Sequence, residues 1–176
     1  MSSMSSTTYY PVTPNLARWI VVGFLAGAAS VLVFHQGAVM LMNALELTQR
    51  SPYQLQPTQP FGVPQIWSIT FWGGAWGVLF ASLLRHLGGA RLVIASTLLG
   101  AILPTIIAWF VVAPLKGQPA AAGFVPAGMA FGVIVNAAWG LGTGLGLALF
   151  GGRHRTTERR LSSIDRRGTP ERREAV

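Results

Sequence analysis

The sequence has no cysteine and very little charge, and both absences narrow what the protein can be. Without cysteine there is no disulfide, no thiolate nucleophile and no cysteine-ligated zinc or iron–sulfur centre. Only 10% of the 176 residues are charged, against about 25% in soluble domains. Because 51% of the residues are hydrophobic, the composition favours a membrane protein over a soluble one.

Four long apolar stretches run through the sequence. They cover residues 19–45, 66–84, 92–115 and 125–150. A helix needs about 20 residues to cross a hydrocarbon core of about 30 Å, and a helix pairs its backbone polar groups within the segment. We therefore predict an all-α membrane protein, a four-transmembrane-helix bundle connected up-down-up-down within residues 15–151.

Both flanks of this region are polar. We expect residues 1–14 to form a disordered N-terminus, because they offer little apolar surface to bury. Residues 152–176 form an Arg-rich tail with eight of the thirteen Lys and Arg residues. The tail follows a span directly and also carries acidic residues, so we expect it to contact anionic lipid and not nucleic acid.

The basic residues predict the orientation. With four spans, the termini and the second loop share one side, which holds Arg18, Arg85, Arg91 and the eight basic residues of the tail. The opposite side holds only Arg50 and Lys116. Because cytoplasmic loops carry the excess of Lys and Arg, we predict that both termini lie in the cytoplasm. The Arg-, Ala- and Gly-rich composition suggests a bacterial cytoplasmic (inner) membrane.

Small residues recur every fourth position in the last span. The row consists of Gly128, Gly132, Asn136, Gly140 and Gly144. Positions four apart share one helix face, and membrane helices associate through close approach at small residues. We predict that this row is a helix-packing face, in which the amide of Asn136 bonds across a helix interface.

The second span offers a shorter counterpart of this face, Gly73 and Gly77. A tight turn with Gly88 and Gly89 follows that span, and glycine readily closes a helix end. We therefore expect spans two and three to be antiparallel neighbours.

One short internal similarity links spans two and four. Residues 74–77 read Gly-Ala-Trp-Gly and residues 137–140 read Ala-Ala-Trp-Gly. Both spans run in the same direction, so a duplicated hairpin would give this pattern. The match covers a few residues that are common in membrane helices, and we interpret it as chance similarity.

A candidate polar site lies in the first span. His35 follows Trp19 by about 24 Å of helix, and a regular helix would project Glu46 within about 20° of His35. Ionisable groups at membrane depth usually face the protein interior or water. We predict a polar vestibule beneath the proline-rich loop of residues 48–64. Its candidate residues are His35, Gln36, Asn43, Glu46, Gln65 and Ser68.

The alternative is that the first span leaves the membrane near Val39, because its 27 residues exceed the number needed to cross. Asn43 and Glu46 would then be surface residues, and His35 would be an interfacial anchor.

Reactive groups are scarce in the spans. Haem ligation by two histidines would need both within the membrane, and His86 and His154 fall on the cytoplasmic side. The sequence also shows no pairing of a nucleophile with a base. We predict no metal, no cofactor and no enzymatic activity. The leading hypothesis is a non-enzymatic accessory subunit or scaffold that acts through helix–helix contacts, with itself or with a larger membrane complex. The alternative is a small oligomeric transporter or channel with a polar path near His35 and Glu46, and a membrane enzyme ranks third.

Overall fold

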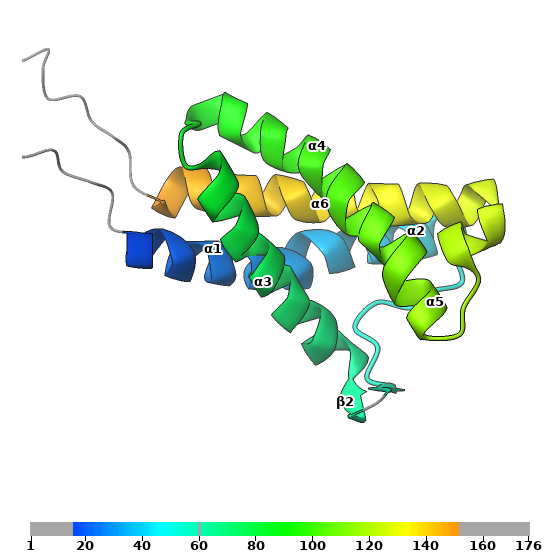
Figure 1. The fold of residues 1–176 in the computed structure, drawn as a ribbon. Helices are drawn as coiled ribbons and strands as arrows, with labels where there is room; N and C mark the ends of the chain where they lie inside the picture. Colours follow the sequence, from blue (N-terminus) through cyan, green and yellow to red (C-terminus); the bar gives the residue numbers. More distant parts are fainter. Residues whose placement is uncertain (1–15, 60, 152–176) are drawn as a thin grey trace, which may run out of the picture.

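The computed structural model describes residues 16–59 and 61–151. The N-terminal segment 1–14 and the Arg-rich tail 152–176 lie outside the described residues. Within them, four helices are long and apolar enough to cross a membrane, and they pack as a bundle (Figure 1). The predicted all-α membrane fold is confirmed. Each helix begins and ends within three residues of its predicted apolar stretch.

The first span is a continuous helix from Leu16 to Ala44 with a wider turn in its middle. It consists of α1 (Leu16–Ser30), a π-helical turn η1 (Val31–His35) and α2 (Gln36–Ala44). Such π turns insert a residue into a helix and are frequent at functional sites.

The loop after the first span contains a minimal hairpin. Strands β1 (Pro57–Thr58) and β2 (Val63–Pro64) pair antiparallel, with Pro57 opposite Pro64. The helix α3 (Gln65–Leu84) begins directly after β2. Proline at this boundary costs no hydrogen bond, because the first N–H groups of a helix have no helical partner.

The third span also changes its winding along its length. It consists of α4 (Gly89–Ile107), a second π turn η2 (Ala108–Val112) and the short α5 (Ala113–Leu115). Pro104 lies inside α4. Since proline has no N–H, it interrupts the helical hydrogen bonds one turn before η2.

A tight left-handed turn leads into the last span. This turn is η3 (Ala120–Phe124), in which Ala121 and Ala122 have φ angles of 48° and 53°. The last helix, α6 (Pro126–Phe150), then runs without interruption. Pro126 occupies the start of that helix, where its fixed φ suits the first turn.

The helices do not pack in the order of the sequence. The first span lies between α3 and α6, and α6 lies between the first span and α4. The spatial order is therefore α3, α1, α6, α4. Each hairpin, formed by spans one and two or by spans three and four, is a tightly packed pair.

The expectation that spans two and three are neighbours holds only near their turn. The glycine turn joins α3 to α4 at one end, and the two helices then diverge (Figure 1) and scarcely touch along their length. Each has a partner elsewhere that offers a face of small residues, and close packing there outweighs the short connection.

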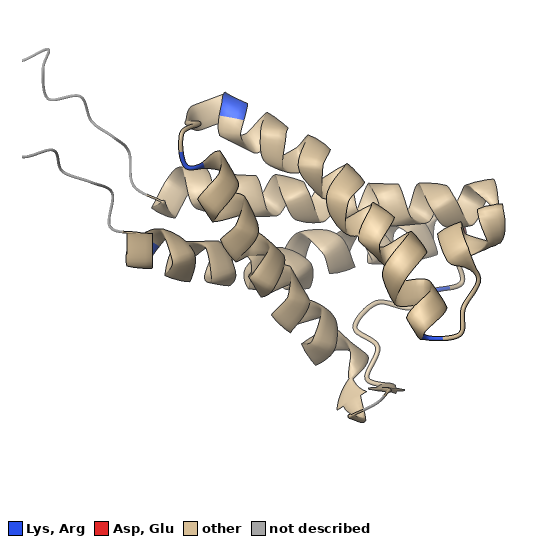
Figure 2. Cartoon of the chain, in the orientation of Figure 1, with Lys and Arg blue, Asp and Glu red and all other residues tan. Residues whose placement is uncertain are grey.

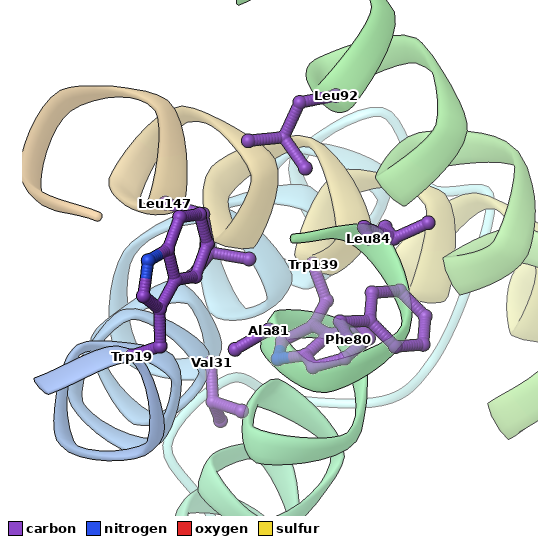
Figure 3. Close-up of a cluster of buried hydrophobic side chains, with 8 residues drawn as sticks. All are labelled: Trp19, Val31, Phe80, Ala81, Leu84, Leu92, Trp139 and Leu147. Carbon is purple, nitrogen blue, oxygen red and sulfur yellow. The ribbon is translucent and has the colours of Figure 1, made fainter. Parts of the chain in front are cut away.

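A cluster of buried side chains extends from the end of the bundle where α1 begins to its middle (Figure 3). All four long helices contribute to it. Its members are Trp19, Val31, Phe80, Ala81, Leu84, Leu92, Trp139 and Leu147. Trp139 of α6 lies edge-on to Phe80 of α3, with ring centroids 5.2 Å apart.

The described basic residues lie at the two ends of the bundle (Figure 2). We call the end where α1 begins and α3 turns into α4 the proximal end, and the end with the two long loops the distal end. Arg18, Arg85 and Arg91 are at the proximal end, and Arg50 and Lys116 are at the distal end. Between these two ends, the described helices carry no charged side chain. This holds for the first span from Trp19 to Ala44, for α3, for the third span after Arg91 and for α6.

Candidate functional site

The π turn of the first span frees a backbone carbonyl. The N–H of Gln36 bonds to the carbonyls of Val31 and Val33, and so skips that of Leu32, its partner in a regular α-helix. The hydroxyl of Tyr53 donates to this released carbonyl of Leu32 at 2.8 Å. Tyr53 thus supplies a donor for the carbonyl that the π turn leaves without a helical partner.

The same tyrosine is also held through its backbone. Its N–H donates to Oε1 of Gln36 at 2.7 Å, and Gln36 is buried in the bundle. Tyr53 has a φ of 51°, a left-handed conformation that costs about 1–2 kcal/mol for a residue with a Cβ. The two hydrogen bonds therefore clamp the distal loop onto the first span.

His35 and Gln36 lie together, as neighbours in sequence and in space. Nε2 of Gln36 is 3.3 Å from Nδ1 of His35. The amide of Gln36 thus joins the imidazole on one side to the backbone of Tyr53 on the other. Sequence reasoning missed Tyr53, because its partner carbonyl becomes available only through the π turn.

The structure does not bring Glu46 to this group. The helix ends at Ala44, and Glu46 is exposed beyond it with a φ of 58°. The N–H of Leu47 bonds to Met42 and that of Glu46 bonds to Asn43, at 2.9 and 3.0 Å. These two bonds form a Schellman motif, in which Glu46 occupies the position usually held by glycine. The helix end and the π turn both shift Glu46 away from the face expected for a regular helix.

The other vestibule candidates make separate contacts. Asn43 donates to the carbonyl of Thr48 at 3.3 Å and so fixes the start of the loop. The backbone N–H of Gln65 donates to Gln56 at 2.9 Å, which pins α3 to the same loop. Ser68 lies one turn further along α3. Among the described residues, no hydrogen bond joins the side chains of Gln65 or Ser68 to His35 or Gln36.

The proximal half of the glycine row packs against α4. A Cβ at Gly140 would overlap the carbonyl oxygen of Ser96, and one at Gly144 would come within 2.8 Å of Cβ of Ser96. On the facing helix, a Cβ at Gly100 would lie 2.7 Å from Cα of Gly140. Real Cβ atoms do not approach so closely, so the two backbones touch only because these residues are glycines.

The distal half of the row has different neighbours. Gly128 faces Ala122 of the left-handed turn, and Gly132 faces the indole of Trp109, whose nitrogen would lie 3.1 Å from an added Cβ. Asn136 donates to the hydroxyl of Thr105 at 2.9 Å, and that hydroxyl lies 3.4 Å from the carbonyl of Gly132. The amide is therefore bonded across the α4–α6 interface.

A second glycine interface joins the first span to α3. Gly73 and Gly77 face Gly27 and Gly23, and a Cβ on any of the four would meet atoms of the facing helix closer than 3.0 Å. Sequence reasoning missed the pair in α1, although its spacing of four residues carries the same signal as the row in α6.

Trp139 is the polar centre of the bundle. Its indole N–H donates to the carbonyl of Gly27 at 2.9 Å, and its own carbonyl accepts bonds from Ser30 at 2.6 Å and from Thr143 at 2.9 Å. All four residues are buried. The bonds with Gly27 and Ser30 join α1 to α6 where water is excluded, and there such a bond is worth about 0.6–2 kcal/mol.

The described residues contain no cluster of three or more His, Cys, Asp or Glu side chains that could hold a metal ion. Two hydroxyls within this part of the chain, those of Thr70 and Ser96, are buried without a partner. The site therefore consists of hydrogen-bonded helix contacts and the His35–Gln36–Tyr53 group. No protein-family model, curated protein or solved structure matches the chain.

Proposed function

We propose that the protein is a non-catalytic membrane component, an accessory subunit or scaffold that acts through helix–helix contacts. It resides in a bacterial cytoplasmic membrane with both termini in the cytoplasm. The observation that supports this proposal is the use of the polar groups at membrane depth. Ser30, Thr105, Asn136, Trp139 and Thr143 all bond to groups of the bundle.

The surface left for partners is apolar. Bulky side chains of α3 point outward, among them Trp67, Phe71 and Trp72, and so do those of α4, such as Ile102 and Ile106. Lipid covers such faces as well as protein does, so the energy of a contact comes from shape and close packing. The two glycine interfaces, α1 with α3 and α4 with α6, set how these faces are arranged within each hairpin.

A small transporter or channel is the second candidate. The observation that favours it is the group of His35, Gln36 and Tyr53 near the distal end, where Gln36 is buried. In such a protein this group would form the distal part of a polar path, which Glu46 would join only from the surface.

Purification of the full chain from its native membrane, in a mild detergent, separates the two candidates. An accessory subunit co-purifies in a fixed ratio with a larger membrane complex. A transporter forms a stable homo-oligomer that moves a solute when it is reconstituted in vesicles, and that result would contradict the scaffold.

A further inference from the structure

The hairpin formed by spans one and two is similar in sequence to the hairpin formed by spans three and four when the two are aligned by their structures. Residues 17–28 of the first helix align with residues 90–101 of the third without a gap, and five of the twelve positions are identical. The identical pairs are Ala17 and Ala90, Arg18 and Arg91, Leu25 and Leu98, Gly27 and Gly100, and Ala28 and Ala101. In the second helix of each hairpin, α3 and α6, the similar segments 74–77 and 137–140 align with each other.

Burial follows the same alignment. In the first helices the buried residues Trp19, Gly23 and Gly27 correspond to Leu92, Ser96 and Gly100. In the second helices the buried residues Gly77, Phe80, Ala81 and Leu84 correspond to Gly140, Thr143, Gly144 and Leu147. Gly27 also packs on Gly77 as Gly100 packs on Gly140. The two hairpins, in parallel orientation, therefore share one packing pattern, which favours duplication over chance similarity.

Two equivalent interfaces between the copies are in different states. The interface of α1 with α6 is closed, whereas its counterpart, the interface of α4 with α3, is open. Val39 and Val135 of the closed interface are 4% and 3% exposed. The corresponding residues of the open interface, Val112 and Trp72, are 39% and 61% exposed.

The open interface has an unused hydrogen-bond pair at its middle. In the closed interface, Trp139 donates to the carbonyl of Gly27. The corresponding donor is Trp76, whose indole N–H has no hydrogen bond among the described residues. The corresponding acceptor is the carbonyl of Gly100, whose helical donor is missing because residue 104 is proline.

The two interfaces differ in residue size at the proximal end. The closed interface has Gly142 against Ser30 and Gly146 against Ala26. At the two glycine positions, the open interface has Leu79 and Leu83. Leu79 and Leu83 are 41% and 54% exposed, so they are not packed as closely as the glycines of the closed interface.

We propose that the open interface closes, by a tilt of the distal halves of α3 and α4 toward each other in which Trp76 donates to the carbonyl of Gly100. This conformational change is independent of the proposed function. In secondary transporters built from internal repeats, one repeat or bundle likewise rocks against the other.

The absence of native cysteine makes a distance measurement direct. Trp72→Cys with Val112→Cys places nitroxide labels on two exposed positions of the open interface, and pulsed EPR on the full chain in lipid nanodiscs measures their separation. We expect two distance populations. Trp76→Phe, which keeps a ring but removes the N–H, reduces the shorter population about threefold, the effect of one average hydrogen bond between membrane helices.

A control pair lies on the packed helices α4 and α6. Ile94→Cys with Leu149→Cys also uses exposed positions, in the proximal halves that do not tilt, and keeps one narrow distance with and without Trp76→Phe, which shows that the variant is folded. A single long distance between labels at positions 72 and 112 overturns the proposal, whether or not the Trp76→Phe variant folds. So does a short population that Trp76→Phe leaves unchanged.

Discussion

The indole of Trp139 donates a hydrogen bond to the backbone carbonyl of Gly27, 2.9 Å away on another helix. The contact is possible because Gly27 and Gly73 lack side chains, which lets α1 and α3 approach closely beside the indole. This pair joins α6 to α1, and α3 packs beside it at Gly73, so a small-residue interface meets the polar centre of the bundle here.

Removal of the indole N–H tests that connection. Trp139→Phe keeps an aromatic ring against Phe80 but leaves the carbonyl of Gly27 without this donor. We expect a loss of about 0.6–2 kcal/mol in stability, measured by unfolding in mixed detergent micelles. Trp67→Phe, at an exposed position of α3, is the matched control and should cost much less. Equal losses in the two variants would mean that the bond contributes nothing.

The hydrogen bonds that hold the distal loop at Tyr53 predict a local change in hydrogen exchange when one of them is removed. Tyr53→Phe removes the hydroxyl that bonds to the carbonyl of Leu32. Hydrogen exchange in residues 48–59 should then become faster, while exchange in α6 stays unchanged, because loops open locally before the bundle unfolds. Phe61→Leu changes a ring that is almost fully exposed and should leave the exchange rates unaltered. Unchanged exchange in Tyr53→Phe would show that the loop is held by other contacts.

The helix end at Glu46 predicts a gain in stability. Glu46→Gly should stabilise the protein by up to about 1 kcal/mol, because glycine adopts the left-handed conformation at that position without strain. Glu46→Gln keeps the strain and should be neutral in a thermal unfolding assay. If Glu46 instead served His35 as a charged partner, both variants would be destabilised.

The orientation predicts the location of reporters fused to the chain. Fusions after Gly88 and after Val176 should report the cytoplasm, and fusions near Gln56 and Gly117 should report the opposite side. The second pair lies in the two distal loops, beside the few basic residues at that end. A C-terminal reporter on the opposite side would contradict the orientation.

The sequence predicts the spans well, because hydropathy and length depend only on local composition. The glycine row likewise predicts close packing, since small residues at a spacing of four share a face. The position of Glu46 could not be predicted, because one inserted residue in the π turn rotates everything beyond it. The packing partner of each helix could not be predicted either. The turn at Gly88 suggests that α3 packs on α4, and only the facing glycines in the structure show that it does not.

A comparison of glycine variants tests most directly whether the glycine interfaces hold the helices together. Gly140→Ala and Gly27→Ala each place a methyl group against backbone of a facing helix. Overpacking of this kind costs about 1–3 kcal/mol. Gly132→Ala comes closer than 3.4 Å only to a side chain, the indole of Trp109, and should cost less.

The control is Gly37, a helical glycine of α2 with nothing within 4 Å of an added Cβ. Gly37→Ala should be neutral or stabilise by up to about 1 kcal/mol, because alanine is the better helix former. The measurement is the unfolding temperature of each variant in one detergent. We predict that it falls for Gly140→Ala and Gly27→Ala, falls less for Gly132→Ala and does not fall for Gly37→Ala. If all four variants unfolded at the same temperature as the unsubstituted protein, these glycines would not hold the helices together.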